Sequence, residues 1–399
     1  MIHAASGYSE IRSWEKAAVE ASKLALEKAG LSRASTVFLF ATSSHRKQLD
    51  KILPRIKKIT GAEHLIGSSG WGILTEELEI ERRPGLAVLV VDGPELEISS
   101  LALENLQENN FMAGAAAGNW LKTLDLPPEA VVTFADPFSF QSPHFFDGLE
   151  INYGYIPLIG GCAGEDGREG KTYQWAGTQN LYDAVSLVSL GGALRHATGL
   201  ARSCQPFGET FQVTRSEGNL IYEMDGRPAY DILLESLSLI EFSSSSPPVK
   251  GDDILQQVFL GLPVKSFQTD FAQSPFMIRH ILGVNAKKGL FSCVSPVEEG
   301  EFVTFTVRNP EFARQDMESM LSELQTRIRP EEARFGIYIN CCARGEALYG
   351  QGNHDVSKIR SFFPKLPVIG IFSYGELAPI DHVNHLHHYS GALSLFAEK

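Results

Sequence analysis

Residues 335–343 read FGIYINCCA and residues 367–377 read PVIGIFSYGEL, and these two segments near the C-terminus indicate the fold class. The first segment is an apolar run of strand length. The second is another apolar run, and it ends in a loop that contains glycine. Between them, residues 354–363 have the pattern of a short helix. The order of strand, helix, apolar edge and glycine loop predicts one α/β unit.

The same order occurs twice more in the chain. The other two copies comprise strand 36–42 (TVFLFAT), helix 48–60 and the edge Leu65-Ile66-Gly67, then strand 130–135 (AVVTFA), a helix at 143–152 and the edge Leu158-Ile159-Gly160. From strand start to loop glycine the three spans are 36 to 67, 131 to 160 and 335 to 370, which are 31, 29 and 35 residues. The similar spacing favours internal duplication of one unit, although Ile-Gly after an apolar residue also recurs by chance.

Further elements flank these units. In the first half we expect a helix at 10–29 and strands at 85–92, 96–103, 184–190 and 193–201. In the second half we expect strands within 211–224, a helix at 228–239, a loop at 243–248 (SSSSPP), strands at 276–283, 289–295 and 301–308, a helix at 312–327 and a last strand at 388–397. The sequence therefore predicts an α/β protein with mixed α+β layers, in which duplicated strand–helix–loop–strand units form two linked domains, residues 1–220 and 221–399.

Composition narrows the class of protein. Of the 399 residues, 43% are hydrophobic and 21% are charged, which is typical of a globular chain rather than a disordered one. The 48 acidic residues outnumber the 35 basic ones by 13, which disfavours nucleic acid or an anionic membrane as a partner. Five cysteines, an odd number, favour a reducing compartment. With no signal-peptide pattern at the start and only strand-length apolar runs, we expect a cytoplasmic protein.

Common catalytic motifs are absent from the sequence. It contains no GxxxxGK[ST] phosphate loop, no GxSxG nucleophile elbow, no CxxC pair and no HExxH. This absence weakens the familiar enzyme classes and leaves a non-catalytic binding protein as the leading interpretation.

The three glycine loops are candidate ligand contacts. Glycine allows the backbone to approach a ligand closely and to present N–H groups to an anion or a carbonyl. The alternative is a tight turn at a strand end, in which glycine serves only the backbone. The candidate residues are Ser68 and Ser69 in the first loop, Cys162 and Glu165 in the second, and Ser373, Tyr374, Gly375 and Glu376 in the third.

Arg344 is the candidate charged anchor, because it follows directly after an apolar strand. Its planar fork of donors suits a carboxylate, and Glu376 could hold an ammonium group, so the pair could bind a zwitterion such as an amino acid. The alternative is a structural pair between Arg344 and Glu376. The neighbouring Cys341 and Cys342 could supply a nucleophile with a histidine as base, but buried thiols usually serve packing, and we expect five free thiols.

Four histidines gather near the C-terminus: His382, His385, His387 and His388. On a strand, His385 and His387 point to the same face, as axial haem ligands or metal ligands could. No carboxylate or cysteine at metal-site spacing supports a metal ion strongly, so a satisfied, partly buried pair is the simpler interpretation.

Taken together, these segments resemble the FIST family. PVIGIFSYGELAP (367–379), LHHYSGALSLF (386–396), IYINCCARGEALYG (337–350) and GRPAYDILLESL (226–237) are similar to the FIST C-terminal domain. FLFATSS (38–44) and LIGSSGWGIL (65–74) are similar to the N-terminal domain, whose loop usually reads G-C-S-x-x-G-E-I. Here Gly72-Ile73 stands in place of Gly-Glu, whereas Glu165 and Glu376 retain the acid in the other two copies.

The resemblance implies a cytoplasmic sensory input module that binds a small ligand, an amino acid being the usual proposal. It implies a separate signalling partner such as a kinase, and in some bacterial members a bound haem that senses nitric oxide. The expected function is therefore a small-ligand sensor without a required cofactor. The alternatives are a haem-binding gas sensor, a Cys/His-dependent enzyme and an interaction scaffold.

Overall fold

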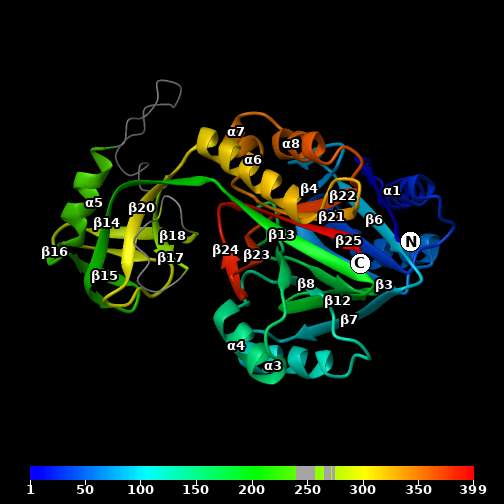
Figure 1. Ribbon diagram of the computed structural model, residues 1–399, viewed down its shortest axis with the longest axis horizontal. Coiled ribbons are helices and arrows are strands. Elements are labelled where there is room, and N and C mark those ends of the chain that lie inside the picture. The colour runs from blue at the N-terminus through cyan, green and yellow to red at the C-terminus, as the bar shows by residue number, and fades with distance from the viewer. Residues whose placement is uncertain (240–256, 265–270, 272–274) are drawn as a thin grey trace. The chain divides into compact units, whose positions relative to one another are not determined.

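The computed structural model describes residues 1–239, 257–264, 271 and 275–399 (Figure 1). These residues form two compact units, one made of Met1–Ala201 and Gln315–Lys399 and the other of Arg202–Arg314. The larger unit therefore takes chain from both halves of the sequence. The predicted mixed α+β architecture is confirmed.

The larger unit contains three six-stranded sheets that share one plan. At the centre of each lies a parallel pair of strands: β2 (Thr36–Thr42) with β3 (His64–Gly70), β8 (Ala130–Ala135) with β9 (Leu158–Cys162), and β21 (Ala333–Cys341) with β22 (Val368–Ser373). Beside the first strand of each pair lie two more strands, which are β6 (Leu86–Asp92) and β1 (His3–Ser9), β12 (Ala184–Gly192) and β7 (Leu96–Glu104), and β25 (Ser390–Glu398) and β13 (Leu194–Arg202). These three parallel pairs are the units expected from the sequence.

The remaining two strands of each sheet form a hairpin. In the chain, this hairpin follows the parallel pair of a different sheet. The hairpin after β3, β4 (Gly72–Thr75) with β5 (Glu79–Glu81), pairs with β22. The hairpin after β22, β23 (Gly375–Ile380) with β24 (Val383–His387), pairs with β9. The hairpin after β9, β10 (Gln174–Ala176) with β11 (Gln179–Leu181), pairs with β3 and closes the cycle. Each sheet is therefore completed by its neighbour.

One glycine occupies the same place in each sheet. Gly67, Gly160 and Gly370 lie opposite Leu39, Thr133 and Tyr338 of the parallel neighbour strand. A Cβ atom at these glycines would lie only 1.9, 2.1 and 1.9 Å from the carbonyl oxygens of those three residues. The three glycines thus occupy equivalent positions in their sheets. Internal duplication of the sequence stays a prediction.

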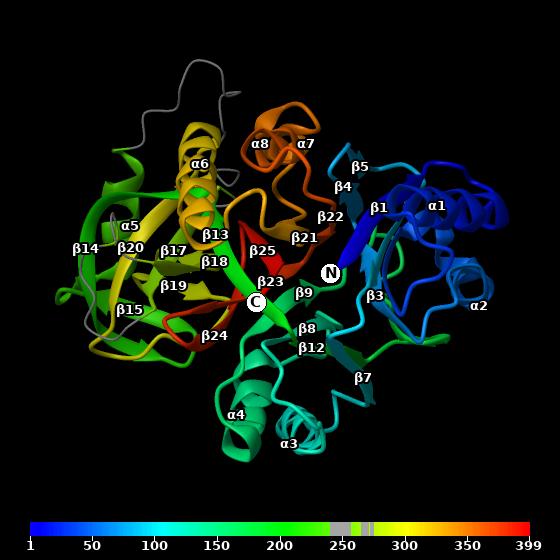
Figure 2. The same ribbon diagram turned by 45° about the vertical axis from the view of Figure 1, so that its right-hand side comes forward.

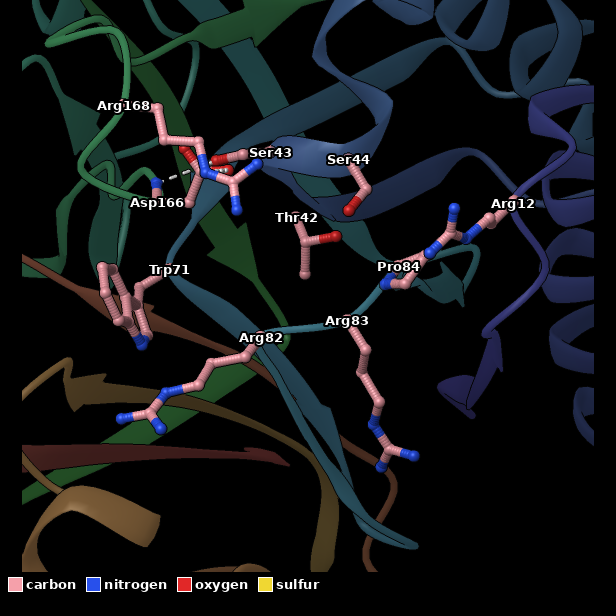
Figure 3. A pocket seen from close by; sticks show the side chains of 10 residues that line it. All are labelled: Arg12, Thr42, Ser43, Ser44, Trp71, Arg82, Arg83, Pro84, Asp166 and Arg168. Atoms are coloured by element: carbon pink, nitrogen blue, oxygen red, sulfur yellow. Dashed lines mark hydrogen bonds and ion pairs between the residues drawn. The ribbon is translucent and has the colours of Figure 1, made fainter.

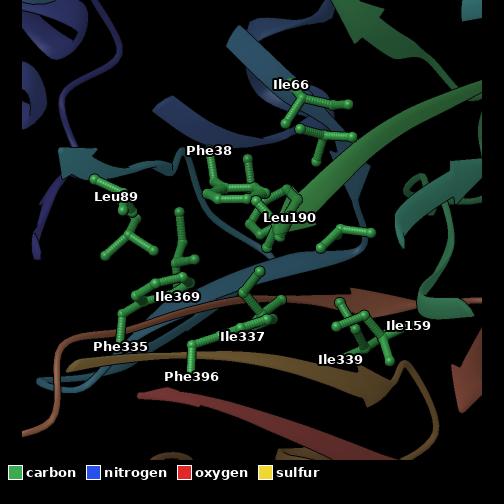
Figure 4. Close-up of a cluster of buried hydrophobic side chains, with 14 of the residues drawn as sticks. Phe38, Ile66, Leu89, Ile159, Leu190, Phe335, Ile337, Ile339, Ile369 and Phe396 are labelled. Carbon is green, nitrogen blue, oxygen red and sulfur yellow. The ribbon is translucent and has the colours of Figure 1, made fainter. Parts of the chain in front are cut away.

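A central apolar core joins the inner faces of the three sheets. Figure 4 shows Phe38, Ile66, Ile159, Ile337 and Phe396 within it. Helices cover the outer faces: α1 (Trp14–Ala29) and α2 (Leu49–Thr60) over the first sheet, α3 (Asn110–Leu121) and α4 (Ser142–Tyr153) over the second, α6 (Pro310–Arg327, from Gln315 on in this unit) and α8 (His354–Phe362) over the third. Since both faces are buried, the central strands are continuously apolar rather than alternating.

Helix α3 was missed by the sequence analysis. Its glycines lower helix propensity, but here they permit close contact with α4, and the two helices lie side by side (Figure 2). A Cβ atom at Gly114 would lie 2.0 Å from the Phe145 carbonyl oxygen, and one at Gly148 would lie 2.0 Å from that of Phe111. Strands β1, β10, β11 and β17 (Val258–Pro263) were missed as well, because they are short or lack a clear alternation.

The smaller unit is a closed barrel. Its strands follow the order β14 (Cys204–Glu217), β20 (Phe302–Arg308), β17, β18 (Phe276–Asn285), β19 (Leu290–Cys293) and β15 (Leu220–Met224), and β15 pairs again with β14. The two-residue strand β16 (Arg227–Pro228) joins β15, and α5 (Ala229–Leu237) packs on the apolar core. The loop predicted at 243–248 lies outside the described residues. Within the described ranges no helix has the length and apolar character needed to cross a membrane.

Candidate functional site

The structure brings the three predicted glycine loops together. Ser69 donates from its Oγ to the Gly164 carbonyl at 2.9 Å. Tyr374 donates from its hydroxyl to the Glu165 carbonyl at 2.9 Å. The backbone N–H of Trp71 donates to the Phe372 carbonyl at 2.9 Å. Several polar groups of these loops thus bond to one another, whereas the buried Ser68 Oγ has no hydrogen-bond partner among the described residues.

Arg344 is a fully buried brace whose carboxylate partner is Asp355. Its Nε lies 3.1 Å from Asp355 Oδ2 and its Nη2 lies 3.1 Å from Oδ1, which is a bidentate ion pair. Nη2 also donates to the Tyr349 hydroxyl at 2.7 Å, and the Tyr338 hydroxyl donates to Asp355 at 2.9 Å. Burial alone would raise the pKa of Asp355, but the Arg344 guanidinium and the hydrogen bonds hold it well below its usual value. The structural alternative named Glu376 as the partner of Arg344, but the carboxylate that pairs with it is that of Asp355. These contacts favour a structural role for Arg344.

Glu376 lies in a separate buried group. Its carboxylate accepts hydrogen bonds from Ser373 Oγ at 3.1 Å and from Ser390 Oγ at 2.7 Å. Burial, and then the nearby Cys341, raise its pKa well above the ordinary value. The pKa of Cys341 is raised by its hydrogen bond to Cys342 and by burial, and the pKa of Cys162 is raised by burial. A raised pKa disfavours the thiolate that a nucleophile needs, so Cys341 is poorly suited to that role.

The predicted histidine pair does not form a clear metal site. His387 is buried and its Nε2 lies 3.1 Å from the Ala378 carbonyl oxygen, so the nitrogen that would ligate iron is already engaged. Its ring centroid lies 5.8 Å from that of His385. No cluster of three metal-ligating side chains occurs in the part of the chain that the structure describes. Haem binding stays a prediction that a Soret band would test.

A pocket of about 470 Å³ lies beside the first loop, and none of the predicted site residues line it. Its wall includes Thr42 at the end of β2, the following Ser43 and Ser44, and Trp71 between β3 and β4. The other lining residues are Arg12, Arg82, Arg83, Pro84, Asp166 and Arg168. Figure 3 shows the four arginines around Thr42, Ser43 and Ser44. We call this cavity the arginine pocket.

The arginine pocket is strongly positive although the chain is acidic. Four arginines and one aspartate give its lining a net charge of three positive units. The loop that carries Asp166 is fixed by a 3.1 Å hydrogen bond from its backbone N–H to Ser43 Oγ. Thr42 Oγ1 accepts a 2.9 Å bond from Gly85 N–H and so holds the segment after Arg82-Arg83-Pro84. Ordered loops thus present flexible cationic side chains to a cavity large enough for a small ligand.

The hairpin β4–β5 connects this pocket to two helices. Trp71 precedes the hairpin, and Arg82 and Arg83 follow it. Within it, Glu79 accepts hydrogen bonds from the backbone N–H groups of Asn353 at 2.7 Å and Val356 at 3.1 Å, at the start of α8. Burial, and then the nearby Asp355, raise the pKa of Glu79 to about 8.

The same hairpin also holds α7 (Glu346–Tyr349). Glu81 accepts a 2.9 Å hydrogen bond from the backbone N–H of Glu346, the first residue of that helix. Ile73, which stands where the family pattern has a glutamate, is fully buried in the central core. That position therefore contributes packing to the hairpin and no charge.

The arginine pocket was difficult to predict from the sequence. Its residues come from five separate segments between Arg12 and Arg168, so no local motif contains them. The available signal was the polar run Ser43-Ser44 at the end of a buried strand and the Arg82-Arg83 pair before Pro84-Gly85.

Comparison with known proteins identifies relatives along nearly the whole chain. Family models of the FIST N domain and the FIST C domain match residues 35–227 and 229–379. An uncharacterised protein of Mycobacterium tuberculosis is 26% identical over 392 residues, 98% of this chain and 99% of the relative. A protein of Mycobacterium bovis is 25% identical, covering 96% of both chains. One of Methanocaldococcus jannaschii is 24% identical, covering 88% of this chain and 71% of the relative.

Among solved structures, cyanuric acid hydrolase from A. caulinodans covers both chains in full. Its TM-score is 0.37 and its sequence identity is 9%. That similarity is too low to indicate a shared fold or activity.

Proposed function

Because the chain belongs to the FIST family, we propose that it is a sensory protein that binds a small carboxylate in the arginine pocket. FIST domains are sensory domains of signal transduction. The protein holds its ligand without transforming it and acts through a separate signalling partner such as a kinase. Its expected location is the cytoplasm.

The observation that supports this proposal is the charge of the arginine pocket. A guanidinium presents paired N–H donors that match the two oxygens of a carboxylate. Four such groups surround one cavity in a protein whose net charge is −13. A positive cavity in an acidic protein attracts small anions and leaves large polyanions, such as nucleic acid, without a continuous positive surface.

The hairpin β4–β5 offers a route from binding to response. A ligand changes a protein's conformation only if it binds two conformations with different affinity. A carboxylate that draws Arg82 into the pocket would act on the end of β5, next to Glu81 and close to Glu79. These two glutamates hold the first turns of α7 and α8, so we propose that their hydrogen bonds differ between the free and the bound state.

Thermal unfolding with a panel of small carboxylates, amino acids and haemin tests the proposal. A ligand at 100 times its Kd is expected to add about 2.7 kcal/mol to the free energy of unfolding. The matched variants are Arg82→Gln in the pocket and Arg33→Gln at a surface ion pair with Glu63. We expect stabilisation by a carboxylate in wild type and in Arg33→Gln, and a large loss of it in Arg82→Gln. Stabilisation that is equal in all three proteins would contradict the proposed site.

A further inference from the structure

Two of the four pocket arginines make no ion pair within the described part of the chain. These are Arg12 and Arg82, both of which have exposed side chains. Arg83, in contrast, lies 2.7 Å from Glu10 Oε2, and Arg168 lies 3.7 Å from Asp166 Oδ2. Pairing within the protein therefore balances two of the positive charges and leaves two.

The pocket has little to offer an ammonium group. Asp166 is the one carboxylate among the described lining residues. Its Oδ2 lies 3.8 Å from Arg46 Nη1 and 3.7 Å from Arg168 Nε, so this oxygen already faces two guanidinium groups. Its Oδ1 is buried and has no hydrogen-bond partner among the described residues. An ammonium group in the pocket would thus meet a lining of net positive charge, whose one carboxylate already faces two guanidinium groups.

The wall also has an apolar part. Trp71 is half-buried, and its ring packs partly against the core of the third sheet. Pro84 lies between the arginine pair and Gly85. A ligand with a short carbon skeleton between its charged groups can contact these side chains while its ends reach the arginines.

We infer that the pocket selects a small ligand with two negative charges, a dicarboxylate or a phosphate monoester, over a zwitterionic amino acid. This inference rests on the proposed function and specifies its ligand class. The guanidinium groups of Arg12 and Arg82, which make no ion pair with another described residue, neutralise the two charges of the ligand. The pairs of Arg83 with Glu10 and of Arg168 with Asp166 stay intact.

Calorimetric titration with glutarate, glutamate and glutamine tests this charge preference. The three compounds share a five-carbon skeleton and carry two, one and no net negative charges at neutral pH. We expect affinity to fall in that order, by about tenfold or more from glutarate to glutamine, the size of one lost charge-assisted hydrogen bond. Phenyl phosphate, titrated in parallel, distinguishes a phosphate preference from a carboxylate preference. Added NaCl is expected to weaken dianion binding.

Variants separate the inference from the proposed function. Arg12→Gln and Arg82→Gln are each expected to weaken dianion binding by about tenfold and to leave glutamine binding nearly unchanged, while Arg33→Gln changes neither. If glutamine binds more tightly than both dianions, and Arg82→Gln weakens it, the pocket is a ligand site but the dianion inference is wrong. If neither dianion binds, the inference is also overturned. If no compound of the panel binds at the pocket, both the dianion inference and the proposed function are wrong.

Discussion

The carboxylate of Glu79 accepts a 3.1 Å hydrogen bond from the backbone N–H of Val356, a residue 277 positions further along the chain. The contact joins hairpin β4–β5, which follows β3 of the first sheet in the chain, to the first turn of α8, which covers the third sheet. It depends on the exchange of hairpins, because β4 pairs with β22 rather than with its own sheet. Because this carboxylate is buried, its titration makes the free energy of unfolding depend on pH.

The free energy of unfolding is expected to fall as pH rises through the titration range of Glu79. The folded-state pKa is raised from 4.5 to about 8, by burial first and then by Asp355. The folded state therefore binds a proton that the unfolded state releases. The resulting stabilisation is complete below pH 4.5 and is lost as pH approaches about 8. The loss is at most about 1.4 kcal/mol per pH unit.

Urea unfolding of wild type and Glu79→Gln across this range measures the effect. The variant removes the titrating group and keeps its shape, so its stability is expected to depend less on pH. An unchanged pH slope in the variant would assign the dependence to other groups.

Arg344→Met is expected to destabilise the protein by about 3–5 kcal/mol, because it leaves Asp355 buried without its partner. The double variant Arg344→Met with Asp355→Leu is expected to recover much of that loss. Arg33→Ala, at an exposed pair with Glu63, is the control and is expected to cost less than about 1 kcal/mol. Near-wild-type stability of Arg344→Met, together with lost ligand binding, would restore Arg344 as the anchor.

Gly370→Ala is expected to cost about 3 kcal/mol or more, because its Cβ would lie 1.9 Å from the Tyr338 carbonyl oxygen. Gly67→Ala and Gly160→Ala are expected to be similarly damaging if the three sheets share one plan. Gly352→Ala, where no atom lies within 4 Å of the added carbon, serves as the control. Measured unfolding free energies that are alike for Gly352→Ala and Gly370→Ala would contradict the shared close contact.

All five cysteines are free in the structure, and only Cys342 is not fully buried. We expect Cys342 to react first with a thiol reagent in the native protein, and five thiols to titrate after unfolding without reductant. A disulfide between Cys341 and Cys342 would be strained, since neighbouring Cα atoms are about 3.8 Å apart. Fewer than five thiols after unfolding would refute this expectation.

The central units of the fold were predictable because their signals are local. Strand β2 occupies residues 36–42 as expected, and α2 differs from its predicted range by one residue. Helix α3 was missed because Gly114 is required by backbone contact with α4, which propensity does not describe. The exchange of hairpins among the sheets could not be predicted either, because it depends on pairing between residues far apart in sequence.

The candidate site was harder to predict than the fold. The position of Arg344 at a strand end suggested a ligand anchor. In the structure, its Nε and Nη2 donate to the carboxylate of Asp355, eleven residues later. The pocket arginines are exposed and scattered, so in the sequence they look like ordinary surface charges. Only the fold shows that Arg12 and Arg82 share a cavity with Trp71.

A crystal structure of the protein with the carboxylate that binds most tightly in solution tests whether the arginine pocket is the ligand site. We predict that the ligand lies in the arginine pocket, with its carboxylate groups within hydrogen-bond distance of Arg12 and Arg82. We also predict that Arg344 keeps its ion pair with Asp355 in that complex. A ligand bound at Arg344 and Glu376, or anywhere outside the arginine pocket, would contradict the account.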